Sequence, residues 1–196
     1  MIEVGLSGGI GSGKTSVSKV FRNIGIPVYY ADIEAKKLMN SEPALISEIT
    51  SILGSQAYTN GTINKEYIAQ EIFSDSEKRK KIESFVHVTV KKDYKLWVLK
   101  QQAAFVIHEN ALMFARNTYT NFDKSIYVYC PANMRAQRIA QRDNISEYEI
   151  QQRMSAQATD SECIEKADFV IHNDNTELII PQITQIYSTI KHTIHG

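Results

Sequence analysis

The sequence predicts an α/β fold in which helices cover a five-stranded parallel sheet. Two observations lead to this prediction. Five short apolar runs of strand length alternate with longer amphipathic segments, whose apolar residues recur every three or four positions. A glycine-rich loop joins the first apolar run to the first amphipathic segment, and five of the nine glycines lie within the first 13 residues. Apolar runs separated by helices are typical of parallel sheets that are buried on both faces.

The length and the charge balance limit what the protein can be. A chain of 196 residues is long enough to bury a substantial core without metal or disulfide crosslinks, so we expect a single domain, residues 1–196, with insertions. The 22 Lys and Arg residues balance the 22 Asp and Glu residues, so no overall field attracts nucleic acid or an acidic membrane. We therefore expect a small enzyme that binds any polyanion locally, with neither nucleic acid nor membrane as a partner.

The cysteines and the apolar segments point to a cytoplasmic protein. Cys130 and Cys163 match no metal-binding or C-x-x-C spacing, which favours reduced thiols. No segment approaches the roughly 20 apolar residues of a membrane-spanning helix. The first residues resemble neither a signal peptide nor a basic leader.

The first predicted strand, residues 1–6, leads into a loop with the pattern of a phosphate-binding site. Residues 8–15 match G-x-x-x-x-G-K-[ST], in which glycines let backbone N–H groups wrap a polyphosphate. Lys14 would reach the outer phosphates, and the Thr15 hydroxyl could ligate Mg²⁺. A chain of this length matches the pattern by chance about once in a hundred or less, so the loop predicts nucleotide binding. Neither the D-x-x-G nor the N-K-x-D string of switch-type GTPases occurs in the chain.

The second predicted strand, residues 26–30, ends just before Asp32. Ligands bind at the carboxyl edge of open α/β sheets, so we expect Asp32 on the same rim as the phosphate-binding loop. If one strand lies between the two, their separation is roughly 10 Å, at about 4.8 Å per strand step. A γ-phosphate and an acceptor hydroxyl would fit there, which makes Asp32 a candidate catalytic base. The alternative is that Asp32 only caps a helix over residues 33–39.

Residues 41–100 are predicted to be mostly helical and polar. Ser41 is expected to cap one helix, with a proline in its first turn. Apolar residues at helical spacing predict a longer helix from Asp75 onward, although residues 86–90 also alternate as in a strand. A helical insertion between the second and third strands, here at about residues 55–100, is where small kinases often place the acceptor.

Three further strands are expected at residues 103–108, 125–130 and 167–172, and an amphipathic helix over residues 177–194 would follow them. The helix after the fourth strand carries arginines.

Arg135, Arg138 and Arg142 are three and four residues apart, so they share one helix face. Late arginines in an enzyme with a phosphate-binding loop can close over the phosphates as a lid, expected here at about residues 140–157. Arg142 is favoured for this role because it lies where the helix gives way to a connecting segment. The alternative is that the arginines only form surface salt bridges with nearby acidic residues.

Taken together, these segments resemble the dephospho-coenzyme A kinase family over nearly the whole chain. The glycine-rich motif is shared by a superfamily, whereas the order of the motifs together is specific. Residues Gly5–Thr15 are similar to that family's G-L-T-G-G-I-G-S-G-K-S. The other residues that carry the resemblance are Ala31-Asp32, Val128–Pro131, Gln137-Arg138, Arg142-Asp143, Arg153 with Gln157, and Ala167–Ile171 followed by Asn173.

The resemblance implies a three-layer P-loop kinase core with a helical acceptor-binding insertion and a lid. Lys14 would contact the β- and γ-phosphates of ATP, and Thr15 would bind Mg²⁺. The residues implied to hold the ATP phosphates are Gly9, Gly11, Ser12, Gly13, Lys14, Thr15 and Ser16.

The resemblance also implies roles outside the loop. Asp32 would take the proton from the ribose 3′-hydroxyl of dephospho-CoA, and Arg142 would be the lid arginine. Asn173 would lie near the adenine. His87 falls where the family has His-Pro in the region that binds the acceptor.

The chain departs from the family pattern in three places. His87 is followed by Val88 instead of proline. The family's P-L-L-F-E element is replaced by Ala111–Ala115, so its proline and its glutamate are both missing. Glu109 stands near the place of that element's upstream aspartate.

The sequence therefore predicts an ATP-dependent kinase that phosphorylates the ribose 3′-hydroxyl of dephospho-CoA, with Mg²⁺ as cofactor and a monomer or small homo-oligomer as its assembly. One alternative is another small P-loop kinase acting on a nucleoside or a small alcohol. A second alternative is a nucleotide-binding regulatory protein, which would need no base at Asp32.

Overall fold

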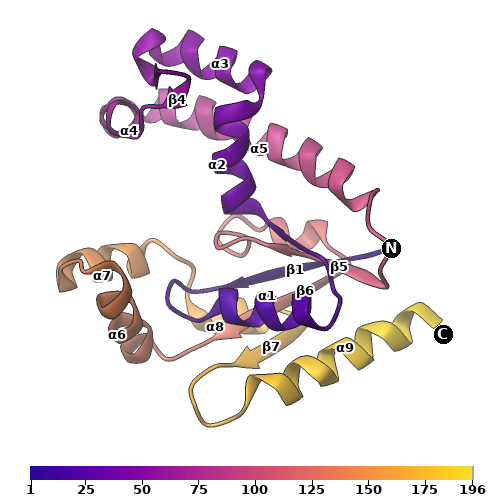
Figure 1. The fold of residues 1–196 in the computed structure, drawn as a ribbon. Helices are drawn as coiled ribbons and strands as arrows, with labels where there is room; N and C mark the ends of the chain where they lie inside the picture. The colour runs from indigo at the N-terminus through magenta and orange to yellow at the C-terminus, as the bar shows by residue number, and fades with distance from the viewer. Residues whose placement is uncertain (196) are drawn as a thin grey trace. The chain divides into compact units, whose positions relative to one another are not determined.

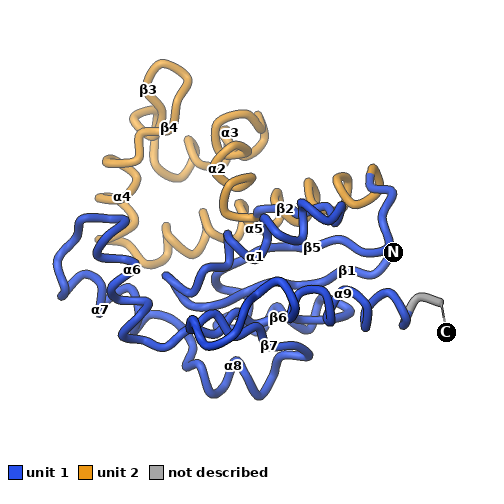
Figure 2. Tube along the Cα trace, turned by 60° about the horizontal axis from the view of Figure 1, so that its bottom comes forward, with its two compact units in different colours: residues 1–30, 101–196 blue, residues 31–100 orange. Residues whose placement is uncertain are grey.

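The computed structural model describes residues 1–195. The chain forms two compact units, residues 1–30 with 101–196, and residues 31–100 (Figure 2). The first unit is an α/β domain. The second is helical with one small hairpin. Within residues 1–195, no helix combines the length and the apolar character needed to cross a membrane.

A five-stranded parallel sheet lies at the centre of the first unit (Figure 1). Its order is β2-β5-β1-β6-β7 in the described part of the chain, so the predicted fold class is confirmed. β5 lies between β1 and β2, which is the arrangement considered above for Asp32. The strands are β1 Ile2–Gly8, β2 Val28–Tyr30, β5 Phe105–Glu109, β6 Lys124–Tyr129 and β7 Phe169–His172.

Alternating side chains along β6 show how the sheet forms two cores. Ile126 and Val128 pack with side chains of α1 Lys14–Asn23 and α9 Ile179–His195. Tyr127 belongs to a separate cluster on the other face, with residues of the segment after β5 and of α8 Asp160–Lys166. Successive strand residues point to opposite faces, so helices cover the sheet on both sides. These two cores give the three-layer architecture.

Two helices follow β6 before α8: α6 Ala132–Asp143 and α7 Glu147–Ser155. The sequence analysis predicted α6 but not α7 or α8. Both begin with a capping box, from Ser146 to Glu149 and from Thr159 to Glu162. This S/T-x-x-E spacing is a sequence signal for a helix start, so both helices could have been found. The remaining element of this unit is the short 3-10 helix η2 Thr118–Asn121.

The second unit has its own small core. Buried Leu45, Ile49 and Leu53 on one helix pack with Ile68 and Ile82 from two others. Asn60 and Gly61 have φ values of 51° and 74° and join the two strands of a hairpin, as a two-residue turn of this type does. The elements of this unit are α2 Ala31–Ser41, α3 Pro43–Leu53, η1 Ser55–Ala57, β3 Tyr58–Thr59, β4 Thr62–Ile63, α4 Lys65–Ser74 and α5 Ser76–Val98.

Two local predictions in this unit were wrong. Ser41 does not cap α3; it is the last residue of α2, and its hydroxyl donates to the carbonyl of Lys37 at 3.0 Å. The cap position of α3 is Glu42, without a side-chain hydrogen bond. The helix that Asp32 was considered to cap begins at Ala31, so Asp32 lies inside its first turn.

Candidate active site

The phosphate-binding loop runs from the end of β1 at Gly8 to the start of α1 at Lys14. Gly11 and Gly13 have φ values of +79° and +93°, the left-handed region that favours glycine. A Cβ atom on Gly8 would lie 2.5 Å from the carbonyl oxygen of Val128. Larger residues would therefore clash or strain the backbone. The loop delivers the chain directly into the N-terminus of a helix, which attracts anions.

The Lys14 ammonium lies across this loop. Its Nζ donates to the carbonyl of Gly8 at 2.6 Å and to that of Gly9 at 3.1 Å. Ser12 N donates to Gly9 O at 3.0 Å and holds the turn closed. A positive charge and the dipole of α1 therefore act at the same place, as phosphate binding requires.

Arg135, from the first half of α6, is buried against the loop. Its Nη2 donates to Asp160 Oδ2 at 2.9 Å, and Tyr127 Oη donates to Asp160 Oδ1 at 2.5 Å. Burial raises the pKa of the Tyr127 phenol, and its hydrogen bond to Asp160 raises it further, so the phenol stays protonated as a donor. Arg135 is therefore neither a lid residue nor a surface salt bridge, the two roles that its spacing suggested.

Asn173 forms a hydrogen bond with the second half of the loop. Its Nδ2 donates to Ser12 O at 2.7 Å, and a side chain on Gly13 would collide with it. Arg138 holds Asn173 in turn, with Nη2 donating to its carbonyl at 3.2 Å and Nη1 contacting Cys130 Sγ at 3.4 Å. The predicted role of Asn173 near adenine stays a prediction, but its side chain has a firm structural role.

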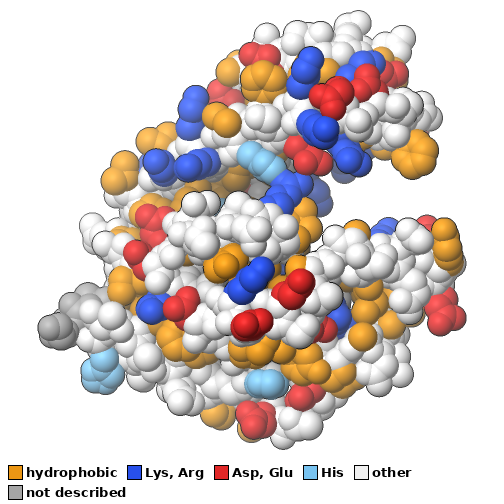
Figure 3. Space-filling model, turned by 180° about the vertical axis from the view of Figure 1, so that it is seen from behind, with side chains coloured by type: hydrophobic (Ala, Val, Ile, Leu, Met, Phe, Trp, Pro, Cys, Tyr) orange, Lys and Arg blue, Asp and Glu red, His pale blue; other side chains and the backbone are white. Residues whose placement is uncertain are grey.

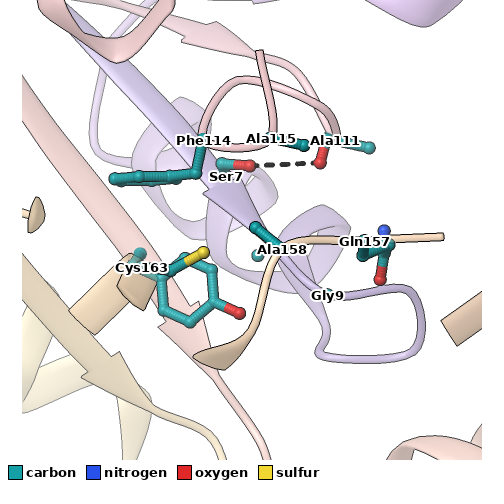
Figure 4. Close-up of a pocket in the computed structure, with 10 residues that line it drawn as sticks. Ser7, Gly9, Ala111, Phe114, Ala115, Gln157, Ala158 and Cys163 are labelled. Carbon is teal, nitrogen blue, oxygen red and sulfur yellow. Dashed lines mark hydrogen bonds between the residues drawn. The ribbon is translucent and has the colours of Figure 1, made fainter. Parts of the chain in front are cut away.

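Gln157 holds the loop at Ile10, whose backbone N–H donates to Gln157 Oε1 at 2.8 Å. Gln157 and Ala158 also line a small pocket beside Gly9 (Figure 4). In the same view, Ser7 Oγ donates to Ala111 O at 3.4 Å. The complete lining consists of Ser7, Gly8, Gly9, Ala111, Phe114, Ala115, Tyr127, Gln157, Ala158 and Cys163. The segment that lacks the family's proline and glutamate therefore borders the phosphate-binding loop.

Arg142 lies at the end of α6 and is 62% exposed. It donates to both Asp143 carboxylate oxygens, at 2.7 and 3.0 Å, and Arg153 Nη1 reaches the same carboxylate at 3.1 Å. The Arg142 hydrogen bond is the main reason that the pKa of Asp143 is lowered. Two arginines thus share one carboxylate in the segment predicted to act as a lid, and that function stays a prediction.

Asp32 and His87 belong to the second unit. Asp32 is exposed, two residues after β2 ends at Tyr30. In the sheet register, Tyr30 is level with Glu109, which is level with Leu6 of β1. His87 is exposed on α5. Their predicted contacts with an acceptor stay predictions.

Several residues that shape this site were not found from the sequence. Spacing placed Arg135, Arg138 and Arg142 on one helix face, and Arg142 was favoured as the lid arginine for its place near the helix end, but the burial of Arg135 against the loop was not predicted. Asp160, the partner of Arg135, follows the cap residue Thr159, so the capping box would have placed it at a helix start. No sequence signal connects it to Arg135.

Among the described residues, no group of three or more His, Cys, Asp or Glu side chains is arranged to hold a metal ion. Thr15 is exposed at the start of α1.

Basic and acidic side chains both occur on the face shown in Figure 3, in keeping with the balanced composition.

Comparisons with known proteins extend over almost the whole chain. The family model for dephospho-CoA kinase matches residues 2–178. A dephospho-CoA kinase from Bacteroides fragilis (strain YCH46) is 33% identical over 195 residues, covering 99% of this chain and 95% of that protein.

Two solved structures share the fold. A protein from Thermus thermophilus has a TM-score of 0.82 and 24% identity, covering 100% of this chain and 98% of that one. A dephospho-CoA kinase from Campylobacter jejuni has a TM-score of 0.69 and 22% identity, covering 97% and 98%. At these identities the likeness concerns the fold alone.

Proposed function

The chain belongs to the dephospho-CoA kinase family, and on this premise we propose that it transfers the γ-phosphoryl group of ATP to the ribose 3′-hydroxyl of dephospho-CoA, giving coenzyme A and ADP. This reaction is the last step of coenzyme A synthesis. The observation that carries the proposal is the phosphate-binding loop, whose backbone contacts Lys14, Gln157 and Asn173. The loop follows β1, and Asp32 follows β2, which lies two strands from β1 in the sheet.

The loop supports the donor half of the reaction. Phosphoryl transfer needs mainly alignment and stabilisation of charge on the transferred group. Backbone N–H groups and the Lys14 ammonium provide both at the N-terminus of α1. The residues proposed to hold the ATP phosphates are Gly9, Gly11, Ser12, Gly13, Lys14, Thr15 and Ser16.

Asp32 is proposed as the base that takes the proton from the acceptor hydroxyl. An exposed carboxylate has access to a substrate, and proton transfer to a positioned carboxylate contributes to such reactions. His87 is proposed to contact the acceptor, which the insertion at about residues 55–100 would bind. The departure at Val88 concerns this half of the site.

Mg²⁺ is proposed as the cofactor, held by Thr15. The donor chemistry fits, because Mg²⁺ prefers oxygen ligands and in kinases takes most of them from phosphates and water, needing only one or two from the protein. The exposed Thr15 hydroxyl offers one such ligand. When bound, Mg²⁺ neutralises charge on the phosphates.

Arg142 is proposed as the lid arginine in a segment at about residues 140–157, and Asn173 is proposed to lie near the adenine. An exposed arginine already paired with a carboxylate can exchange that partner for phosphate oxygens, because carboxylates and phosphates both offer two anionic oxygens to its donor fork. We further propose a cytoplasmic, monomeric or small homo-oligomeric protein with a single kinase domain, and neither nucleic acid nor membrane as a partner.

A coupled ADP-release assay tests the proposal. Purified protein is mixed with Mg²⁺ and ATP and then with dephospho-CoA, adenosine, nucleoside monophosphates or shikimate. We expect dephospho-CoA alone to stimulate ADP release strongly, with coenzyme A as the product. Stimulation by another alcohol and not by dephospho-CoA would favour a different small kinase. ADP release that no acceptor stimulates would favour a nucleotide-binding regulator.

A further inference from the structure

Arg135 carries a buried charge that the proposed reaction does not use directly. Its side chain is 9% exposed, and its ion pair with Asp160 is 2.9 Å long. Asp160 is held from its other oxygen by the Tyr127 hydroxyl. The three side chains come from α6, α8 and β6, so the network joins elements that are distant in the sequence.

The network touches the phosphate-binding loop at two points. The Arg135 guanidinium lies against Gly9, where a side chain would collide with it. The Arg135 main chain lies against Gly11, because a Cβ atom there would be 2.7 Å from Arg135 O. Arg135 Nε is buried without a hydrogen-bond partner among the described residues, so packing against the loop, as well as hydrogen bonding, keeps the side chain in place.

Burying a charge is costly, and removing one partner of a buried pair leaves the other uncompensated. The neighbouring loop explains why a buried ion pair is found at this place. Gly9 and Gly11 have no side chains to define the loop conformation, and the Arg135 side chain and backbone occupy the space beside them.

We propose that Arg135, held by Asp160 and Tyr127, is a positioning residue that sets the conformation of the loop from Gly9 to Gly11 and thereby the affinity for nucleotide phosphates. The inference deepens the proposed function and rests on it only for the identity of the donor. Arg135 acts through the loop and is not itself a catalytic residue.

The position of the network in the sheet offers a matched control. Tyr127 is level with Ser7, directly before the loop, in the β1–β6 register. A second carboxylate, Asp168, binds the same strand at its other end, accepting from Ser125 N and Ser125 Oγ at 2.8 Å each. Ser125 is level with Gly5, well before the loop. Loss of Asp160 or of Asp168 removes a side-chain contact between β6 and the segment that carries that carboxylate. Of these two contacts, the one through Asp160 belongs to the network that touches the loop.

The test measures ADP affinity by calorimetry in the presence of Mg²⁺, together with thermal stability, for four variants and the control. We expect Arg135→Gln and Asp160→Asn to weaken ADP binding about 10- to 100-fold, the effect of leaving a buried polar partner unsatisfied. Tyr127→Phe should weaken it less, and Arg135→Lys should retain part of the affinity because its charge still pairs with Asp160. Asp168→Asn should lower the melting temperature and leave ADP affinity within about twofold of wild type.

Kinetics separate positioning from general loss of structure. We expect KM for ATP to rise in Asp160→Asn while KM for the acceptor stays unchanged. A purely structural role would instead lower kcat through the folded fraction and leave both KM values alone, which would overturn the inference. Unchanged ADP affinity in Asp160→Asn and Tyr127→Phe would overturn it also, as would an equal loss in Asp168→Asn. If Arg135→Gln does not fold, the other variants decide the outcome.

Failure of the proposed function would be seen separately. Wild-type protein that binds ADP but is not stimulated by dephospho-CoA would refute the acceptor and leave the comparison of ADP affinities intact.

Discussion

The residues proposed to act in the reaction fall in the two units of the chain and differ in character between them. The phosphate-binding loop in the first unit is partly buried and held at several points, by Lys14, Gln157, Asn173 and the network of Arg135. Asp32 and His87 in the second unit are exposed side chains on helices. A loop rich in glycine needs surrounding contacts to adopt one conformation, whereas an exposed helical side chain needs only its helix.

Because of this difference, we expect substitutions in the two regions to affect folding stability and turnover differently. A substitution around the loop is expected to change binding and folding together, because the same contacts serve both. A substitution of an exposed residue is expected to change turnover more than binding and to leave folding unchanged. The following predictions test that contrast.

The largest effect is expected at Asp32. Asp32→Asn should lower kcat about 10²- to 10⁴-fold, the range for loss of a general base, and leave ADP affinity and the melting temperature unchanged because the side chain is exposed. Steady-state kinetics, calorimetry and thermal unfolding measure the three quantities. Glu34→Gln, on the same helix turn, is the control and should keep kcat near that of wild type. Normal turnover in Asp32→Asn would refute the base and favour a regulatory role.

Arg142 is the informative exception, since it belongs to the first unit but is exposed. Arg142→Ala should lower kcat about 10²- to 10³-fold, as for loss of one donor to transition-state charge, with a smaller loss of ADP affinity and no loss of stability. Arg22→Ala, an exposed arginine at the end of α1, is the control. Equal losses in kcat and in ADP affinity would indicate a static contact with the nucleotide instead of a lid.

His108 tests the buried side of the contrast. Burial on β5, between the rings of Tyr29 and Phe122, lowers the pKa of His108 from 6.5 to about 4. Between these values the unfolded chain binds a proton that the folded chain does not. Stability is therefore full above about pH 6.5 and falls as the pH drops toward 4, by up to about 3 kcal/mol.

Denaturant unfolding across this pH range measures the His108 effect. His108→Phe should flatten the decline, and His192→Gln, which changes an exposed histidine, should not. An unchanged pH slope in His108→Phe would assign the acid sensitivity to other groups.

The smallest effect is expected from helix caps in the two units. Asp75 caps α5 by accepting from Glu77 N and Lys78 N, and Asp75→Ala should destabilise the start of this helix. Hydrogen exchange should show the loss within residues 31–100, with ADP affinity unchanged. Thr159→Ala removes the cap next to Asp160 at a similar cost and should also weaken ADP binding. If both variants affect ADP binding equally, the two regions are coupled and the contrast fails.

The sequence predicted best what depends on short-range pattern. All five strands of the sheet were found because each is an apolar run between helices, and the loop was found because its glycines recur at a required spacing. Gly54 and Asn60-Gly61 show the same local logic, since their positive φ values suit these residue types.

Contacts between distant residues could not be read in this way. The face of α6 that is buried depends on where β6 and α8 lie, so spacing alone did not separate Arg135 from Arg142. Gln157 meets Ile10 across a separation of 147 residues, and Asn173 meets Ser12 across 161. The contacts that hold the loop are thus the part of the site that is hardest to predict from the sequence.

The division of the chain at Tyr30–Ala31 and Lys100–Gln101 has an evolutionary consequence. Residues 31–100 enter after β2 and leave before β5, which are neighbouring strands, and they have a hydrophobic core of their own. A segment with its own core draws part of its stability from contacts within itself. On the proposed function, in which this segment binds the acceptor, mutations that alter the choice of acceptor and mutations that alter the handling of nucleotide fall in different parts of one gene.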